Sequence, residues 1–272
     1  MLRAQRKAIE TGFHTDDGNL QISQDGGRTW SERSGNVQGL RDGTYVSRIV
    51  ASRSASDIAY VTFDAHRDGD FEPYIFRTPD FGETWTSLAA GLPSGSVNSM
   101  AEHPDNPNVL FAGTEHGLFV STSAGTRWAK LSHLPTTHVD DLVLHPREKD
   151  LVIGTHGQSI WILDDTPPLA EWTAEVASAA AHVFTIQSTT IFNHRKDTSY
   201  RGQDEFYGTN PVDGAVITYT LGLGSGTATF HITNASGRVV QELHHSVRSR
   251  RSSSELGSEA RYLGRAAGLD AP

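Results

Sequence analysis

Acidic, histidine and amide side chains gather at two repeated places along the sequence. Some stand near the start of three similar segments, "VSRIVASR", "VNSMAEHP" and "VDDLVLHP", and others stand in turns that follow the second strand of each repeat. On one shared face they could bind glycan hydroxyls or a cation, or serve in acid/base catalysis. The alternative is structural, because turns favour short polar residues in any protein. The candidates are Arg48, Asn98, Asp140 and Asp141 near strand starts, and Asp16, Asp17, Asp64, His66, Glu115, His116 and His156 in turns.

Other sites of known chemistry are poorly matched. The stretch "DAHRDGD" (64–70) has alternating oxygen donors, but Ile75 stands where a calcium loop needs its bidentate glutamate, so a polar hairpin is favoured. The 13 histidines show no zinc-ligand spacing. The "GLGSG" run at 222–226 lies between strand patterns, so it reads as a turn and not as a phosphate loop. No G-x-S-x-G nucleophile motif occurs, and we expect neither a metal nor a cofactor.

A second recurring pattern combines a hydroxyl, an acid, glycine and tryptophan. It reads "SQDGGRTW" (23–30) and "TPDFGETW" (78–85), with a degraded copy, "STSAGTRW" (121–128). We interpret it as a structural turn: the acid accepts backbone N–H groups, glycine allows positive φ, the hydroxyls tie the hairpin, and tryptophan supplies apolar surface. A calcium site or catalytic acid is the weaker alternative. The residues concerned are Ser23, Asp25, Gly27, Thr29 and Trp30; Thr78, Asp80, Gly82, Thr84 and Trp85; and Ser121, Gly125 and Trp128.

Short strand patterns surround these turns at even spacing. Each unit reads strand, strand, turn, strand, tryptophan turn, strand, which predicts a four-stranded antiparallel blade of a β-propeller. Residues 1–165 supply about three to three and a half blades, whereas four to eight usually close a ring. We therefore expect a fragment of a longer protein. The alternative is that the chain needs another chain to close the propeller.

The pattern changes after the propeller segment. We expect a short helix and linker over 166–210, with Thr166 as the helix cap and Leu169, Trp172 and Val176 on one face. Two strand patterns, "GAVITYTLG" and "TATFHITNASGRVVQEL", are joined by the glycine-rich turn and predict an incomplete β-sandwich-like segment over 211–245. Residues 246–272 are expected to be a disordered tail. The fold class is thus all-β.

The tryptophan turns and phrases such as "PYIFRTPDFGETW", "GTEHGLFVS" and "THGQSIWILDD" resemble the bacterial BNR (Asp-box) repeat proteins. Those proteins are often labelled glycosyl hydrolases and are akin to sortilin (VPS10) propellers and, more distantly, to sialidases and xyloglucanases. The resemblance spans about residues 15–243. It implies that the tryptophan turns lie at the outer edge of each blade, and that the protein is secreted or periplasmic, although this chain starts without a signal-peptide pattern. The family's N-terminal blades and the end of its sandwich have no counterpart here, which suggests a truncated or frame-shifted product.

Composition limits the classes of partner. The net charge of −9 repels phosphate backbones, so no nucleic-acid partner is expected. No apolar run is long enough to span a bilayer. The chain has no cysteine, which excludes disulfides and thiolate chemistry.

The resulting prediction is a propeller scaffold that binds a glycan or a protein without catalysis of its own. One alternative is a sialidase-like or BNR glycoside hydrolase whose remaining catalytic groups lie in missing blades; Arg48 is the one arginine that the repeats place on the expected face of such a site. Another is a pseudogene-like product that does not fold stably alone.

Overall fold

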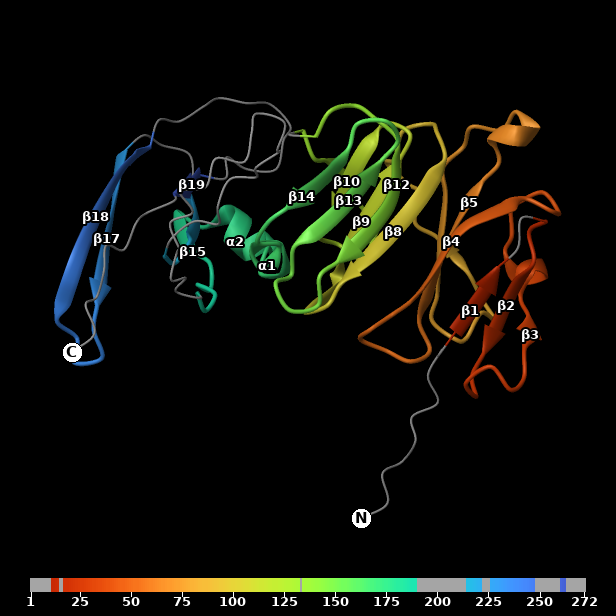
Figure 1. Ribbon diagram of the computed structural model, residues 1–272, viewed down its shortest axis with the longest axis horizontal. Coiled ribbons are helices and arrows are strands. Elements are labelled where there is room, and N and C mark those ends of the chain that lie inside the picture. The colour runs from red at the N-terminus through yellow and green to blue at the C-terminus, as the bar shows by residue number, and fades with distance from the viewer. Residues whose placement is uncertain are drawn as a thin grey trace, which may run out of the picture. The chain divides into compact units, whose positions relative to one another are not determined.

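Figure 1 shows the computed structural model, which describes residues 11–14, 17–132, 134–189, 214–221, 226–247 and 260–262. The chain divides into two compact units, Met1–Trp172 and Thr173–Pro272. The described residues form mainly β-strands, with two short α-helices. The fold is all-β, and the first unit is a partial β-propeller.

Four antiparallel sheets follow one another along the first unit. Two of them have four strands in chain order: β4 (Tyr45–Ala51), β5 (Ala59–Asp64), β6 (Tyr74–Thr78) and β7 (Thr86–Ser87), then β8 (Val97–His103), β9 (Asn106–Thr114), β10 (Gly117–Ser121) and β11 (Ala129–Lys130). The first and fourth sheets have three described strands each: β1 (Thr11–His14), β2 (Leu20–Ser23) and β3 (Ser31–Glu32), and β12 (Val139–Leu144), β13 (Leu151–Thr155) and β14 (Ile160–Leu163). Every strand pairs with its neighbour in the chain, which is the meander of a propeller blade.

Apolar side chains fill the space between successive sheets. One cluster joins the third and fourth sheets, where Phe111 and Leu118 pack with Leu142 and Ile153. A second joins the second and third sheets around Tyr60 and Met100, and two smaller ones join the first and second sheets. Because alternate residues of a strand point to opposite faces, a sheet between two others buries both faces. This explains why β5, β10 and residues 109–114 of β9 are almost continuously buried.

The first strand of three sheets carries a β-bulge at the same position. In β4, Val46 pairs with Phe63 and Arg48 pairs with Thr62, which leaves Ser47 as the extra residue. The same irregularity leaves Asn98 as the extra residue in β8 and Asp140 in β12. A bulge bends its strand and redirects the extra side chain, and such bulges often lie next to functional sites. The repeat therefore includes an irregularity that the strand patterns did not reveal.

The helical segment differs from the sequence prediction. Instead of one helix capped by Thr166, there are two, α1 (Pro167–Ala170) and α2 (Ala174–Ser178), and the side chain of Thr173 caps the second. The Thr166 hydroxyl donates to the carbonyl of Lys149 and contacts Nε2 of the buried His103, so it is not available as a cap. Tertiary hydrogen bonds have thus outweighed the local capping signal.

The second unit contains a three-stranded sheet in the order β15 (Ala181–Val183), β16 (Ile217–Leu221), β19 (Ala260–Tyr262), and a hairpin of β17 (Gly226–Thr233) and β18 (Val239–Val247). The pattern "TATFHITNASGRVVQEL" therefore forms two strands and not one. In the turn between them, the Asn234 side chain accepts hydrogen bonds from the backbone N–H groups of Ser236 and Arg238. The sequence predicted a disordered tail over residues 246–272, but residues 260–262 of this segment form strand β19. Residues 222–225 of the expected glycine-rich turn lie outside the described residues.

Candidate functional site

The three tryptophan turns, here called the outer turns (residues 23–30, 78–85 and 121–128), connect the last two described strands of the first, second and third sheets. In the second turn, Thr78 Oγ1 accepts from Gly82 N at 2.8 Å and donates to Asp80 Oδ1 at 2.8 Å. Asp80 also accepts from the backbone N–H and the hydroxyl of Thr84 at 2.8 and 2.7 Å. Trp85 Nε1 closes the turn by donating to the carbonyl of Gly82. Nearly all of these polar groups thus bind one another.

The first outer turn repeats these contacts. Ser23 replaces Thr78 as the buried hydroxyl, and Asp25 accepts from Thr29 N and Oγ1 at 2.8 and 2.7 Å. Hydrogen bonds from the backbone and then the hydroxyl of Thr29 lower the pKa of Asp25 from 3.8 to about 2. For Asp80, partial burial acts to raise the pKa, but hydrogen bonds from Thr84 and Thr78 bring it below its ordinary value.

The degraded third turn keeps only part of this network. Ser121 Oγ still accepts from Gly125 N at 2.9 Å, but Ser123 stands in place of the acid, and Trp128 Nε1 donates instead to the carbonyl of Leu88. Gly82 and Gly125 both have positive φ, and a Cβ on either would lie under 3.0 Å from a side chain of the adjacent sheet. The turn glycines therefore also set how closely neighbouring sheets approach.

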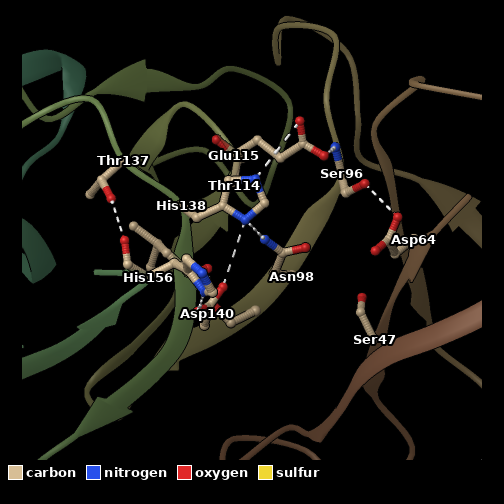
Figure 2. A network of polar contacts seen from close by, with 12 residues as sticks. Ser47, Asp64, Ser96, Asn98, Thr114, Glu115, Thr137, His138, Asp140 and His156 are labelled. Carbon is tan, nitrogen blue, oxygen red and sulfur yellow. Dashed lines mark hydrogen bonds and ion pairs between the residues drawn. The ribbon is translucent and has the colours of Figure 1, made fainter. Parts of the chain in front are cut away.

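A different group of polar residues lies where the first strands begin and the second strands end (Figure 2). We call it the inner polar face. It contains carboxylate, imidazole, amide and hydroxyl groups from three successive sheets: Asp64, Ser96, Asn98, Glu115, His138, Asp140 and His156.

Contacts on the inner polar face repeat from one sheet to the next. Three equivalent residues stand where the second strand of a sheet gives way to the following turn. The strand registers identify them as Asp64, Glu115 and His156. Asp64 Oδ1 accepts from Ser96 Oγ, which precedes the next first strand, at 2.6 Å. Glu115 Oε2 likewise lies 3.9 Å from Nε2 of His138, which precedes the following first strand. The side chain of one sheet thus reaches the strand start of the next.

His138 is the centre of this group. Its Nδ1 lies 3.5 Å from the amide of Asn98 and 3.8 Å from Asp140 Oδ1. Asp140 Oδ2 in turn lies 3.3 Å from Nδ1 of His156, and the two imidazole rings are 6.2 Å apart. Asn98 and Asp140 are the extra residues of the bulges, so the bulges are what direct these two side chains toward His138 (Figure 2).

The surroundings of Asp64 lower its pKa. Partial burial acts to raise it, but hydrogen bonds from Ser96 and His66 lower it below the ordinary value. His66 lies beside Asp64, with its Nδ1 2.6 Å from Oδ1. The Asp64 side chain is therefore a carboxylate at neutral pH, and it accepts hydrogen bonds.

The remaining sequence candidates are less closely connected. Arg48 forms an ion pair with Asp141, which joins β4 to β12. His116 is exposed beside Gly95. Asp17 accepts from the Asn19 amide within its own turn, and Asp16 lies outside the described residues. In "DAHRDGD", Asp70 accepts from Tyr74 and Glu72, and no group of metal-binding side chains is found within the described ranges.

Sequence reasoning missed His138 and Ser96. Both directly precede the valine that opens a first strand, Val139 and Val97. Extending the repeat alignment by one residue would have nominated them. The bulges had no such signal, because a bulge is visible only in the pairing of two strands.

Comparisons with known proteins give similarity of fold only. No protein-family model and no curated protein matches the sequence. Solved structures that are similar include a GH74 xyloglucanase from Xanthomonas campestris (TM-score 0.42, 19% identity, covering 59% of this chain and 25% of that one) and the GH74 enzyme of Niastella koreensis (TM-score 0.43, 20% identity, 56% and 26%). YCF48 bound to a D1 peptide is also similar (TM-score 0.38, 16% identity, 57% and 51%). The chain thus matches about a quarter of the length of each GH74 enzyme. Among the described residues, no helix has the length and apolar character needed to cross a membrane.

Proposed function

We propose that the inner polar face binds a glycan and that the chain acts as a binding scaffold without hydrolysing its ligand. The observation that supports this is the convergence of Asn98, Glu115, His138 and Asp140 from three different strands and turns. Carboxylates accept hydrogen bonds, the amide both donates and accepts, and imidazole does either according to its tautomer. Such a mixture suits the vicinal hydroxyls of a sugar, which need donors and acceptors side by side.

The state of Asp64 suits hydrogen bonding to a ligand and does not suit the role of a catalytic acid. A glycoside hydrolase needs a carboxylic acid that keeps its proton near neutral pH, which requires a raised pKa. The pKa of Asp64 is lowered instead, and its hydrogen bonds from Ser96 and His66 favour the ionised form. The resemblance to BNR-repeat proteins supports an extracytoplasmic setting for this binding.

A glycan array followed by affinity titration tests the proposal. We expect the full chain to retain at least one class of oligosaccharide, and Asn98→Ala or Glu115→Gln to weaken that binding by about tenfold or more, as expected for loss of a hydrogen bond to a ligand. Glu148→Gln is the matched control, because Glu148 is an exposed acid in the turn between β12 and β13, at the other end of those strands. Equal loss in the control, or an array without any bound glycan, would contradict the proposal.

Turnover is measured separately. Bound oligosaccharides and a panel of aryl glycosides should remain intact after long incubation with the chain. Release of aglycone that disappears in Glu115→Gln would replace the scaffold with a glycoside hydrolase.

A further inference from the structure

A histidine followed by proline stands at the end of β8 and directly after β12, at equivalent places in the third and fourth sheets. In both, the ring nitrogen Nδ1 accepts a hydrogen bond from a backbone N–H of the following turn: His103 from Asp105 at 3.1 Å, and His145 from Glu148 at 3.0 Å. The surroundings of the two rings differ. His103 is fully buried, whereas His145 is partly exposed. The pair therefore separates the role of the turn contact from the role of burial.

The residues that follow β14 cover the ring of His103. We call residues 165–170 the cover segment. Thr166 is buried, and its Oγ1 lies 3.1 Å from Nε2 of His103. Pro167 and Pro168, in the first turn of α1, are buried as well. His145 has no hydrogen-bond partner at Nε2 among the described residues, so the cover is what distinguishes the two histidines.

The cover segment is held at both ends by hydrogen bonds to the first unit. At its start, the Asp165 N–H donates to Asp150 Oδ1 at 3.0 Å. At its end, the Asn106 amide donates to the carbonyl of Ala170 at 2.7 Å. Leu169 packs against the apolar cluster that joins the third and fourth sheets. His103 thus lies beneath a short segment whose position depends on few contacts.

The hydrogen bonds around His103 require a neutral ring. Because Nδ1 accepts from the Asp105 N–H, it carries no proton, and the proton of the neutral ring is on Nε2. The Thr166 hydroxyl donates to the carbonyl of Lys149, so its oxygen is left to accept from Nε2–H of His103. A second proton, on Nδ1, would point at the N–H of Asp105. Both ring nitrogens therefore favour the uncharged form.

The charged groups nearby do not remove this preference. Burial lowers the pKa of His103 below 6.5; the Asp105 carboxylate acts to raise it, and the Lys149 ammonium acts to lower it further. Asp105 and Lys149 form an ion pair with each other. Glu102, the neighbour of His103 in β8, instead accepts from Tyr60 of the second sheet. The other charged residues on the elements packed here are Arg147, Glu148, Asp150, Asp165 and Glu171.

We propose that His103 is a pH-sensitive switch: the neutral ring holds the cover segment on the end of the third sheet, and protonation of the ring in mild acid releases that segment while the sheets stay folded. The released residues lead directly to Thr173, where the second unit begins. His103 and Asn98 stand at opposite ends of β8. The switch is therefore separate from the inner polar face and does not depend on glycan binding.

The direction of the pH dependence follows from the difference between the two states. When the cover segment is released, water reaches the ring, and the pKa of His103 returns toward its ordinary value of 6.5. The released state then binds more protons than the covered state below that pH. The cover is held at full strength above pH 6.5 and is weakened as the pH falls, by at most about tenfold per pH unit for one proton.

Hydrogen–deuterium exchange of the full chain, read by mass spectrometry at pH 7 and pH 5, tests the switch. Exchange rates are corrected for the intrinsic effect of pH. In the cover segment, the N–H of Leu169 is bonded to the carbonyl of Thr166 and reports release. We expect protection of this segment to fall by at least about fivefold and by no more than about 30-fold, the limit for one proton between pH 6.5 and 5. Protection of residues 109–114 in β9 should stay the same.

Neutral substitutions of the histidines assign the effect. His103→Gln keeps a donor toward Thr166 and His103→Asn keeps an acceptor for the Asp105 N–H, but neither can be protonated. Protection of the cover segment should then be equal at the two pH values in whichever of these variants folds. His145→Gln is the matched control, because it removes the equivalent, uncovered histidine. It should keep the fall in protection seen in the wild type.

Three outcomes would overturn the proposal. One is equal protection of the wild-type cover segment at pH 7 and pH 5. Another is a fall in residues 109–114 that matches the fall in the cover segment, which would indicate general unfolding in acid. The third is a fall that persists after His103 is replaced or that disappears in His145→Gln. The wild-type measurement alone decides the first two, so the test does not depend on the folding of any variant.

Discussion

The outer turns and the inner polar face use similar side chains. The acids of the outer turns bind groups close in the sequence, whereas those of the inner polar face contact groups in the next sheet. The acid of each intact outer turn bonds within its own turn: Asp25 and Asp80 bind groups no more than four residues away. On the inner polar face, Asp64 binds Ser96, and Glu115 lies near His138, in each case across two sheets. The carboxylates of the intact outer turns are therefore satisfied locally, and the bonds from outside that reach the second turn go to its backbone carbonyls. The inner face has polar groups whose geometry depends on how the sheets pack, and these groups are the ones available to a ligand.

The largest expected effect comes from separating two sheets. Gly113→Ala should lower the free energy of unfolding by about 3 kcal/mol, because the added Cβ overlaps Val139 of the fourth sheet and also Ser99 of the paired strand β8. Gly154→Ala, its equivalent in the fourth sheet, should change the free energy by less than about 1 kcal/mol, on the stabilising side. Urea unfolding of both variants measures the difference. Equal effects would mean that the close approach at Gly113 does not exist.

The outer turns should be the next most sensitive. Thr78→Val keeps the shape of a fully buried side chain but removes the acceptor for Gly82 N–H and the donor to Asp80. An unsatisfied buried donor costs about 1–3 kcal/mol. Thr86→Val, at an exposed position in β7, should cost no more than about 0.5 kcal/mol. The two midpoints in urea should differ accordingly, and coincident midpoints would show that the turn does not stabilise the fold.

The contribution of the first outer turn to stability should depend on pH through Asp25. The pKa of Asp25 is lower in the folded state, so this group favours folding while it is ionised: the contribution is complete above the unfolded value of 3.8 and is lost as the pH falls through about 2. Asp25→Asn should therefore melt at a lower temperature than the wild type at neutral pH, and the two melting curves should converge near pH 2. A constant difference at all pH values would assign the effect to something other than ionisation.

The sequence predicted what is local in this structure and missed what depends on pairing. The sheets could be predicted from the recurring turns and from the strand patterns around Val46, Val97 and Val139. Strand alternation and turn chemistry are encoded in neighbouring residues. The patterns did not reveal the bulges at Ser47, Asn98 and Asp140, which are defined only against the partner strand. For the same reason His138 was not nominated, although its contacts with Asn98 and Asp140 place it at the centre of the inner polar face.

The degraded third turn allows the smallest effect to be tested by gain instead of loss. Ser123→Asp combined with Arg127→Thr restores the acid and the hydroxyl that the intact turns pair at 2.7 Å. Because Ser121 already holds Gly125 N–H as Ser23 holds Gly27 N–H, the backbone provides the conformation that the acid needs. We expect a gain of about 0.5–1.5 kcal/mol, the usual net value of an added hydrogen bond, measured by urea unfolding. Ser123→Asp alone lacks the hydroxyl partner and should gain less; equal gains would mean that the acid acts through backbone N–H groups alone.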